Sequence, residues 1–335
     1  GQYSLNHGQY SLNHGQYSLN HGQYRRRTMK LVFFDDFKLG VVKDDTVVDV
    51  SGAVSGIEHT SPQDLIGKVI ENFSQHRSAL QQAADSGQGT PLDQVRLRSP
   101  LPKPPNIICM AVNYMEDGTR DEPAPINAFQ KSPNSVIGDG DTMVLPDIPA
   151  SIFEGEAEFA LVIGKHASNV KQEDAYDYIF GYLNFIDGSA RGLQAGGNTF
   201  YQMKSRDTFA PMGPYLVTAD EIDDPQNLAI NLWVNEDLKQ SFNSDDMAHK
   251  IPRIIEWVSS IHELEPGDVI ATGTNHRGLS AFQNDDKIEL EVQGLGILHF
   301  SVQDNLNRTW PRTTRLEMAD SGREGTVPQD GGKYS

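Results

Sequence analysis

Cysteine is nearly missing from this sequence, because Cys109 is the only one among its 335 residues. A single thiol excludes a disulfide within the chain and favours a reducing compartment, so we expect a cytoplasmic protein. Long apolar runs are missing as well, and none approaches the roughly 20 residues that a membrane-spanning helix needs. The composition therefore predicts a protein with no membrane partner and no internal cross-link.

Positive charge is also scarce. Lysine and arginine together number 28 against 46 aspartates and glutamates, which gives a formal net charge of -18. Such a chain repels phosphate backbones and anionic membranes, so we expect no nucleic-acid partner. The acidic balance suits a soluble enzyme for small molecules, although a merely solvated acidic surface fits the composition equally well.

The first part of the chain is a repeat. GQYSLNH occurs three times in succession, and each unit offers only a tyrosine and a leucine as apolar positions together with a glycine. That pattern makes a poor helix seam. We interpret residues 1–28 as a tag-like repeat or a disordered arm outside the fold. His7, His14 and His21 lie in this arm, where they could bind a metal only weakly.

Composition changes divide the remaining chain. A proline-rich connector, RSPLPKPP, separates a small N-terminal domain at 29–98 from a larger catalytic domain at 99–310. Residues 311–335 are polar and rich in glycine, so we expect a flexible C-terminal tail. The sequence therefore predicts two domains with loose segments at both ends.

Strand patterns outnumber helical ones. We expect a helix that begins after Ser61, with Pro62 at its first position, then a second helix, a helix over 250–264 and a shorter one over 172–180. Short strands are expected over 30–50, and further strands over 106–112, 142–146, 153–165, 181–187, 214–218, 228–235, 268–272, 287–292 and 297–302. Strands and helices do not alternate regularly, which argues against a doubly wound parallel sheet. The prediction is a β-rich α+β fold.

The stretch FEGEAEFALVIGK places three glutamates, Glu154, Glu156 and Glu158, directly before an apolar run. Alternate residues of a strand share one face, so Glu156 and Glu158 point the same way, roughly 6.5–7 Å apart at the backbone. Burying two like charges without a counter-charge is costly. A cation at this site is one way to balance these charges.

A third carboxylate for the same cation is Asp187, at the end of the next expected strand. Hard carboxylate oxygens suit Mg²⁺ or Mn²⁺ better than zinc, with Ca²⁺ as a further oxygen-binding ion. The alternative is an exposed edge strand whose glutamates simply face water. Local pattern alone leaves both interpretations open.

Four segments in order carry a resemblance to a known family. EAEFALVIGK, GYLNFIDGSARGLQ, MKSRDTFAPMGPYLVT and LEPGDVIATGT together resemble the fumarylacetoacetate hydrolase family. The resemblance covers most of 29–305 and is strongest over 153–275. It implies a core of rolled mixed β-sheets behind a small N-terminal α/β domain, usually in a homodimer. It also implies a divalent metal held by three carboxylates, at positions that match Glu156, Glu158 and Asp187.

The resemblance extends to substrate-binding positions. Lys204 matches a family lysine beside the metal, where a cation would pair with a substrate carboxylate or enolate oxygen. Thr274 matches a position that contacts substrate through its hydroxyl or its backbone N–H. Arg191, Gln194 and Tyr114 are further candidates for the same pocket. The alternatives are a surface lysine, an ordinary strand-end turn and helix-surface residues.

One departure concerns the catalytic base. Many hydrolytic members carry a histidine shortly after an Asn-Tyr pair, on a lid over the substrate, whereas Asp117 occupies that position here. Glu116, Asp117 or Glu122 could replace it, because a carboxylate serves as a base if its pKa is raised. The alternative is a solvated acidic loop. His276, next to Thr274, is another candidate base.

The family's reactions set the functional expectation. Its members act on a metal-chelated 1,3-dicarbonyl or 2-oxo acid through a stabilised enolate, and we expect hydrolysis of a carbon–carbon bond in a carboxylated, acylpyruvate-like substrate. Decarboxylation, a dehydratase or lyase step, or isomerisation on the same site is the alternative. A catalytically inactive homologue that binds a metal and a small acid is the remaining one.

Overall fold

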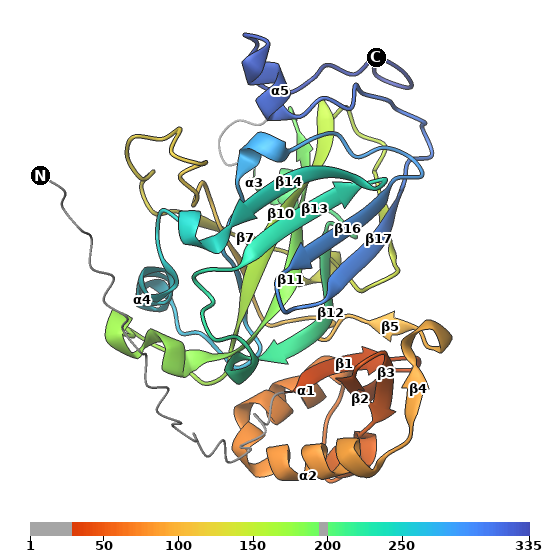
Figure 1. Ribbon diagram of the computed structural model, residues 1–335, viewed down its shortest axis with the longest axis vertical. Coiled ribbons are helices and arrows are strands. Elements are labelled where there is room, and N and C mark those ends of the chain that lie inside the picture. Colours follow the sequence, from red (N-terminus) through yellow and green to blue (C-terminus); the bar gives the residue numbers. More distant parts are fainter. Residues whose placement is uncertain (1–28, 194–199) are drawn as a thin grey trace, which may run out of the picture.

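The computed structural model describes residues 29–193 and 200–335 (Figure 1). The repeat at 1–28 with its three histidines, and Gln194, lie outside the described residues. No helix in the described part of the chain is long and apolar enough to cross a membrane.

A mixed twelve-stranded sheet dominates the molecule, and its main path runs β4-β3-β2-β1-β12-β11-β10-β15-β6-β7. Its longest strands are β10 (Ile152–Ile163), β11 (Ile179–Arg191) and β12 (Ala210–Thr218). Every residue of β10 is buried, so the sheet is covered on both faces there. Shorter strands on this side are β6 (Ile107–Met110), β7 (Ala128–Lys131), β8 (Val136–Ile137) and β15 (Val269–Ala271).

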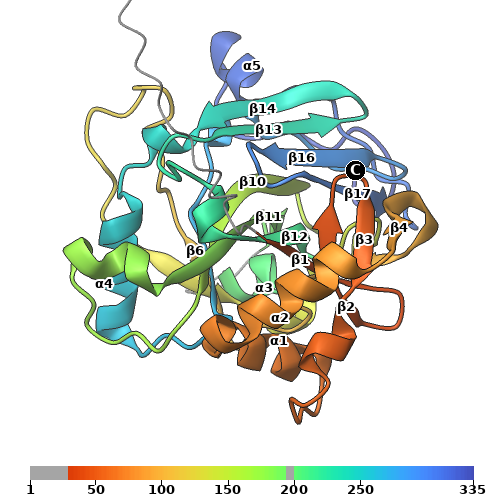
Figure 2. The ribbon, with the colours of Figure 1, turned by 60° about the horizontal axis from the view of Figure 1, so that its bottom comes forward.

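A five-stranded sheet, ordered β14-β13-β16-β17-β9, packs across the long strands (Figure 2). Burial alternates along β13, β16 and β17, because one face meets the core and the other faces water. Its strands are β9 (Thr142–Val144), β13 (Ala229–Val234), β14 (Asp237–Asn243), β16 (Lys287–Val292) and β17 (Ile297–Gln303). Parallel pairing of β6 with β15 and of β9 with β17, among antiparallel neighbours, makes both sheets mixed. The predicted β-rich α+β class, with rolled mixed sheets, is confirmed.

The N-terminal part adds strands to the large sheet rather than forming a sheet of its own. Lys30 pairs with Val217, which joins β1 to β12. The Ser61 side chain caps the first helix by accepting from the Asp64 N–H. Helix α2 packs against β2 and β3, and α1 against α2 (Figure 2). The elements are β1 (Lys30–Phe34), β2 (Lys38–Lys43), β3 (Thr46–Asp49), α1 (Pro62–Glu71), α2 (Phe73–Ser86), β4 (Gly89–Pro91) and β5 (Leu97–Arg98).

Two helices differ from their predicted ranges. The segment predicted as a short helix over 172–180 is a 3₁₀ helix at Gln172–Tyr178, because Ile179 and Phe180 already belong to β11 and seven residues rarely nucleate an α-helix. Helix α4 (Ile251–Ile261) ends before the predicted 264. A short helix, α3 (Phe200–Lys204), precedes β12.

The C-terminal segment contains α5 (Arg315–Asp320), which begins with a capping box between Thr314 and Glu317. Trp310 is buried, and its indole N–H donates to the Ser151 carbonyl at 2.7 Å. The segment thus folds back onto the start of β10. The flexibility expected for 311–335 stays a prediction.

Candidate metal centre

The register between β10 and β11 assembles the acidic cluster. Glu156 pairs directly with Asp187 across the two strands, and Glu158 follows Glu156 on the same face. All three carboxylates are buried, and one oxygen from each lies within 4.8 Å of the others. The structure therefore brings together the three side chains that the sequence predicts as metal ligands.

Two cations reach Glu156. Lys204 Nζ donates to Glu156 Oε1 at 2.8 Å and to Asp187 Oδ2 at 2.5 Å, and an Arg191 Nη donates to the same Glu156 oxygen at 2.5 Å. Burial alone would raise the pKa of Glu156, but Lys204 and Arg191 hold that pKa well below its ordinary value. Burial likewise opposes the charge on Lys204, yet Asp187 and Glu156 raise the pKa of its ammonium. Both groups are therefore ionised at neutral pH.

Lys131 is a functional-site residue that the sequence did not suggest. Its ammonium is fully buried and donates to Asp187 Oδ1 at 2.7 Å, to the Gly188 carbonyl at 3.0 Å and to the carbonyl of Lys204. These contacts fix the orientation of the Asp187 carboxylate. A lysine at the end of a four-residue strand carries no local signal that it will reach a residue 56 positions away.

Glu158 lacks such cations. Its Oε2 accepts the Gly273 N–H at 2.7 Å, whereas its buried Oε1 accepts no hydrogen bond within the described residues. Burial, with Asp187 and Glu156 nearby, raises the pKa of Glu158 well above its ordinary value. An unpartnered buried carboxylate oxygen between two other carboxylates is the arrangement that a hard cation would satisfy.

The spacing of the cluster is compatible with such an ion. Ligand oxygens on opposite sides of Mg²⁺ lie about 4.2 Å apart, and on opposite sides of Ca²⁺ about 4.6–5.2 Å. The 4.8 Å limit of the cluster lies within this combined range, so small side-chain movements would close it around the smaller ion. The residues present therefore fit a divalent metal.

Glu154 connects the cluster to the C-terminal segment. It is buried, and it accepts hydrogen bonds from Arg191 and, through both carboxylate oxygens, from Arg315 at 2.6 and 3.1 Å. Arg191 therefore bridges Glu154 and Glu156. The sequence analysis predicted Arg191 but not Arg315, because only the folded chain brings α5 to β10.

Two predicted substrate-binding residues lie deeper than expected. The Thr274 hydroxyl donates to the Ala157 carbonyl at 2.7 Å and accepts from Gln240 at 2.9 Å, which leaves its backbone N–H as the group for a substrate contact. Tyr114 is buried with its ring edge on Phe242, and burial raises the pKa of its hydroxyl. Their substrate-binding roles stay predictions.

The four candidate bases lie in three different settings. His276 Nδ1 and Glu116 Oε1 form a hydrogen bond of 2.7 Å, so the structure pairs two residues that the sequence offered as alternatives. Asp117 instead accepts from Asn275 at 3.1 Å and from Arg277 at 3.4 Å. Asp117 therefore links residues 112–122, which we call the lid, to the 275–277 turn. Glu122, which also lies in the lid, is exposed.

A cavity of about 520 Å³ lies beside this pair. Three arginines and two carboxylates line it, and each arginine is paired with a carboxylate. Its walls come from the lid, the 276–277 turn and α5, as Val112, Glu116, Thr119, Arg120, His276, Arg277, Arg315, Leu316, Ala319 and Asp320.

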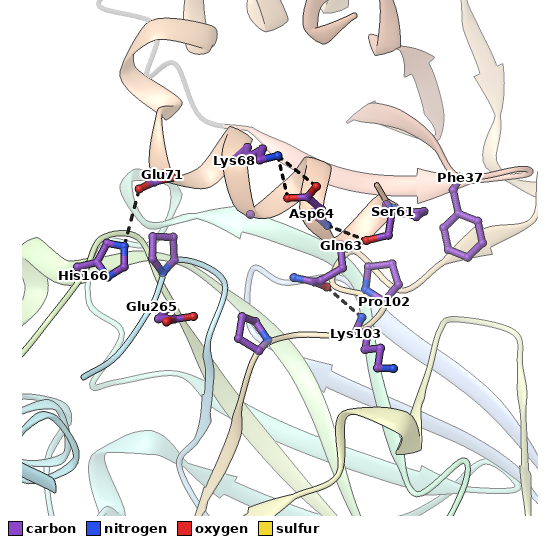
Figure 3. A pocket seen from close by; sticks show the side chains of 14 residues that line it. Phe37, Ser61, Gln63, Asp64, Lys68, Glu71, Pro102, Lys103, His166 and Glu265 are labelled. Carbon is purple, nitrogen blue, oxygen red and sulfur yellow. Dashed lines mark hydrogen bonds and ion pairs between the residues drawn. The ribbon is translucent and has the colours of Figure 1, made fainter. Parts of the chain in front are cut away.

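A second cavity of about 680 Å³ lies between α1 and the loops before β6 and β15 (Figure 3). Its polar side chains pair with one another, as Figure 3 shows for Lys68 with Asp64 and for His166 with Glu71. Four prolines form much of the remaining wall. The cavity beside His276, in contrast, contains Arg315, whose side chain also bonds Glu154 next to the carboxylate cluster.

Known proteins resemble this chain over much of its length. The protein-family model described as "Fumarylacetoacetate (FAA) hydrolase C-terminal" matches residues 106–303. Oxaloacetate tautomerase YisK of Bacillus subtilis is 35% identical over 280 residues, which are 77% of this chain and 93% of that protein.

Two solved structures are also similar. One is maleylpyruvate hydrolase from Sphingobium sp. SYK-6 in complex with manganese (II) ion and pyruvate, with 34% identity and a TM-score of 0.75 over 82% of this chain and 99% of that one. The other is 2-hydroxyhepta-2,4-diene-1,7-dioate isomerase from Mycobacterium marinum, with 26% identity and a TM-score of 0.65 over 83% and 99%. These relatives are enzymes of three reaction types, namely tautomerase, hydrolase and isomerase.

Proposed function

Because the chain belongs to the fumarylacetoacetate hydrolase family, we propose that it is a divalent-metal-dependent enzyme that interconverts the keto and enol forms of a small 2-oxo acid. The observation that carries this proposal is the unpartnered Glu158 Oε1 inside a cluster of three buried carboxylates. A buried anion of this kind needs a counter-charge, and enolate chemistry needs a positive charge beside the reacting oxygen.

Each group of the site has a distinct role in this proposal. Glu156, Glu158 and Asp187 would hold Mg²⁺ or Mn²⁺, and the ion would supply a Lewis acid for the oxygens of the oxo acid. Lys204, held by Glu156 and Asp187, donates a hydrogen bond to the substrate carboxylate or to the enolate oxygen. The arginines in the wall of the cavity beside His276 are the groups that could contact the carboxylate of such a substrate.

We favour tautomerisation over hydrolysis, which was the reaction expected from the sequence. The tautomerase from Bacillus subtilis matches over 93% of its length, and a keto–enol shift needs only a proton carrier and a stabilised enolate. Oxaloacetate is therefore the first substrate to test, with its enol-to-keto conversion followed by absorbance.

Carbon–carbon bond hydrolysis is the second candidate, and the similarity to the maleylpyruvate hydrolase that binds manganese and pyruvate favours it. Product analysis separates the reactions, because hydrolysis gives an acid pair, decarboxylation gives CO₂, and tautomerisation gives neither. A protein with none of these activities would be the inactive homologue. The homodimer and the cytoplasmic location stay predictions.

The metal site is tested by Mn²⁺ titration in a calorimeter. We expect one ion per chain in the wild type, and a loss of affinity greater than about 100-fold in Glu158→Gln, because second-shell changes alone cost 10–100-fold. Glu173→Gln, an exposed carboxylate on the 3₁₀ helix before β11, is the control and should bind normally. Wild-type protein that binds no Mn²⁺, or turnover indifferent to a chelator, would refute the proposal.

A further inference from the structure

His276 and Glu116 lie 160 residues apart in the sequence and form a hydrogen-bonded pair in the wall of the cavity. His276 lies on the turn that follows Thr274 and Asn275. This turn is fastened to β10, because Gln240 bonds both the Ala157 N–H and the Asn275 carbonyl. Ala157 lies between two of the acidic residues of the cluster. The turn is therefore held against β10, and His276 lies close enough to Glu156 to act on its carboxylate electrostatically.

The hydrogen bond also determines which ring nitrogen is basic. Burial opposes the charge of Glu116, but the bond to His276 and the nearby Arg120 hold the pKa of Glu116 below its ordinary value. An ionised carboxylate only accepts hydrogen bonds, so Nδ1 of His276 carries the proton. Its Nε2 then keeps a free lone pair, and among the described residues this atom has no hydrogen-bond partner. The ring lines the cavity, where substrate would lie.

The backbone conformation of the lid positions the Glu116 side chain. Val112, Glu116 and Asp117 all have positive φ angles, of 53°, 56° and 57°, although none is a glycine. Such conformations are costly, and for the β-branched Val112 especially so, and they concentrate at functional sites. Asp246 secures the segment by accepting from the Asp117 N–H at 3.1 Å, while Asn275 bonds the Asp117 carboxylate. The lid is thus tied to the same turn that carries His276.

We propose that His276 is the general base of the reaction and that Glu116 is the positioning residue that orients its ring. This inference rests on the proposed function, because it supplies the proton carrier that the keto–enol shift requires. His276 Nε2 removes a proton from the carbon next to the oxo group, and the C–H electron pair forms the enolate double bond. The imidazolium then returns the proton to the enolate oxygen, which gives the enol. No further reactant is needed.

The two members of the pair come from different segments of the chain. Here the lid contributes the carboxylate and the turn contributes the imidazole, with Asp117 in the former histidine position. Charged groups around the ring are Glu116, Asp117 and Arg120 from the lid, Arg277 from the turn, and Arg315 and Asp320 from α5.

The test is exchange of the pyruvate methyl protons with D₂O, followed by NMR in the presence of Mg²⁺. We expect exchange in the wild type and a loss of about 100-fold or more in His276→Gln and His276→Asn, while Mg²⁺ and pyruvate binding stay within about threefold. Glu116→Gln should lose about tenfold, and Glu116→Asp, which keeps the carboxylate, should recover part of the loss. Added imidazole should restore part of the exchange in His276→Ala.

The matched controls are His59→Gln and Asp121→Asn, an exposed histidine and an exposed lid carboxylate, and both should exchange normally. Exchange at the wild-type rate in the His276 variants would overturn the inference while leaving the proposed function intact. Wild-type protein that binds Mg²⁺ and pyruvate without any exchange would overturn both.

Discussion

Glu156 and Glu158 illustrate how environment separates two identical side chains. They lie two residues apart on one face of β10, yet the pKa of Glu156 is lowered and that of Glu158 is raised. Both are buried. Lys204 and Arg191 donate hydrogen bonds to Glu156, whereas among the described residues Glu158 accepts a bond from the Gly273 N–H and from no cation. Because the two cations bond Glu156, Glu158 is the carboxylate whose charge a bound metal ion would stabilise most.

At the same scale, Asp304 is predicted to carry much of the stability of the C-terminal segment. Arg308 is completely buried, and its guanidinium forms two bonds of 2.9 Å to the Asp304 carboxylate. Asp304→Asn leaves that buried cation without a counter-charge, so urea unfolding at pH 7 should show a loss of about 3–5 kcal/mol. Asp93→Asn, an exposed control, should change stability by at most about 0.5 kcal/mol.

The pH dependence of this effect has a definite sign. Burial opposes the ionisation of Asp304, but the bonds from Arg308 lower its folded pKa below the ordinary 3.8. Its contribution is therefore complete above pH 3.8 and is lost as the pH falls through the lower folded value. The difference between wild type and variant should shrink there. A difference independent of pH would argue that the pair contributes through packing alone.

At the scale of an element, α5 shows how a polar, glycine-rich stretch acquires structure. Its capping box supplies partners for the first free N–H groups, Met318 is buried, and the Arg315 N–H donates to the Leu279 carbonyl at 3.0 Å. The Arg315 side chain then reaches Glu154. Six residues alone would not stay helical, so tertiary contacts hold this helix in place.

Amide hydrogen exchange tests this account of the C-terminal segment. Thr309 pairs with Gly331, and Met318 donates to Thr314, so both amides should exchange about a hundredfold or more slowly than in an unstructured peptide. Glu324 lies on an exposed turn and serves as the internal control, with fast exchange. Intrinsic rates throughout 311–335 would instead support the flexible tail that the composition indicated.

At the scale of the whole molecule, the two parts of the chain share a core. One hydrophobic cluster contains Leu31 and Ile66 from the N-terminal part together with Leu216 and Val269 from the large domain. Leu31 also pairs with Leu216 across the junction of β1 and β12. Separating the parts would expose this cluster to water and leave an open sheet edge.

Calorimetry should therefore show one cooperative unfolding transition, with calorimetric and van't Hoff enthalpies that agree. Leu216→Ala, which leaves a cavity in the shared cluster, should shift the whole transition and lower the free energy of unfolding by about 2–5 kcal/mol. Exposed Leu238→Ala on β14 is the matched control, with little expected effect. Two resolved transitions would mean that the N-terminal part and the catalytic part unfold separately.

The sequence by itself determined the fold class, most strands and the three clustered carboxylates. Strand alternation fixes which side chains share a face, and the spacing of apolar residues marks the core, so these features are local. Tertiary structure alone decided that Lys131 and Arg315 reach the carboxylates, that the Thr274 hydroxyl is already bonded, and that His276 meets Glu116. Such contacts join positions 56 to 161 residues apart, and no periodic pattern encodes them, because only the packing of separate elements brings them together.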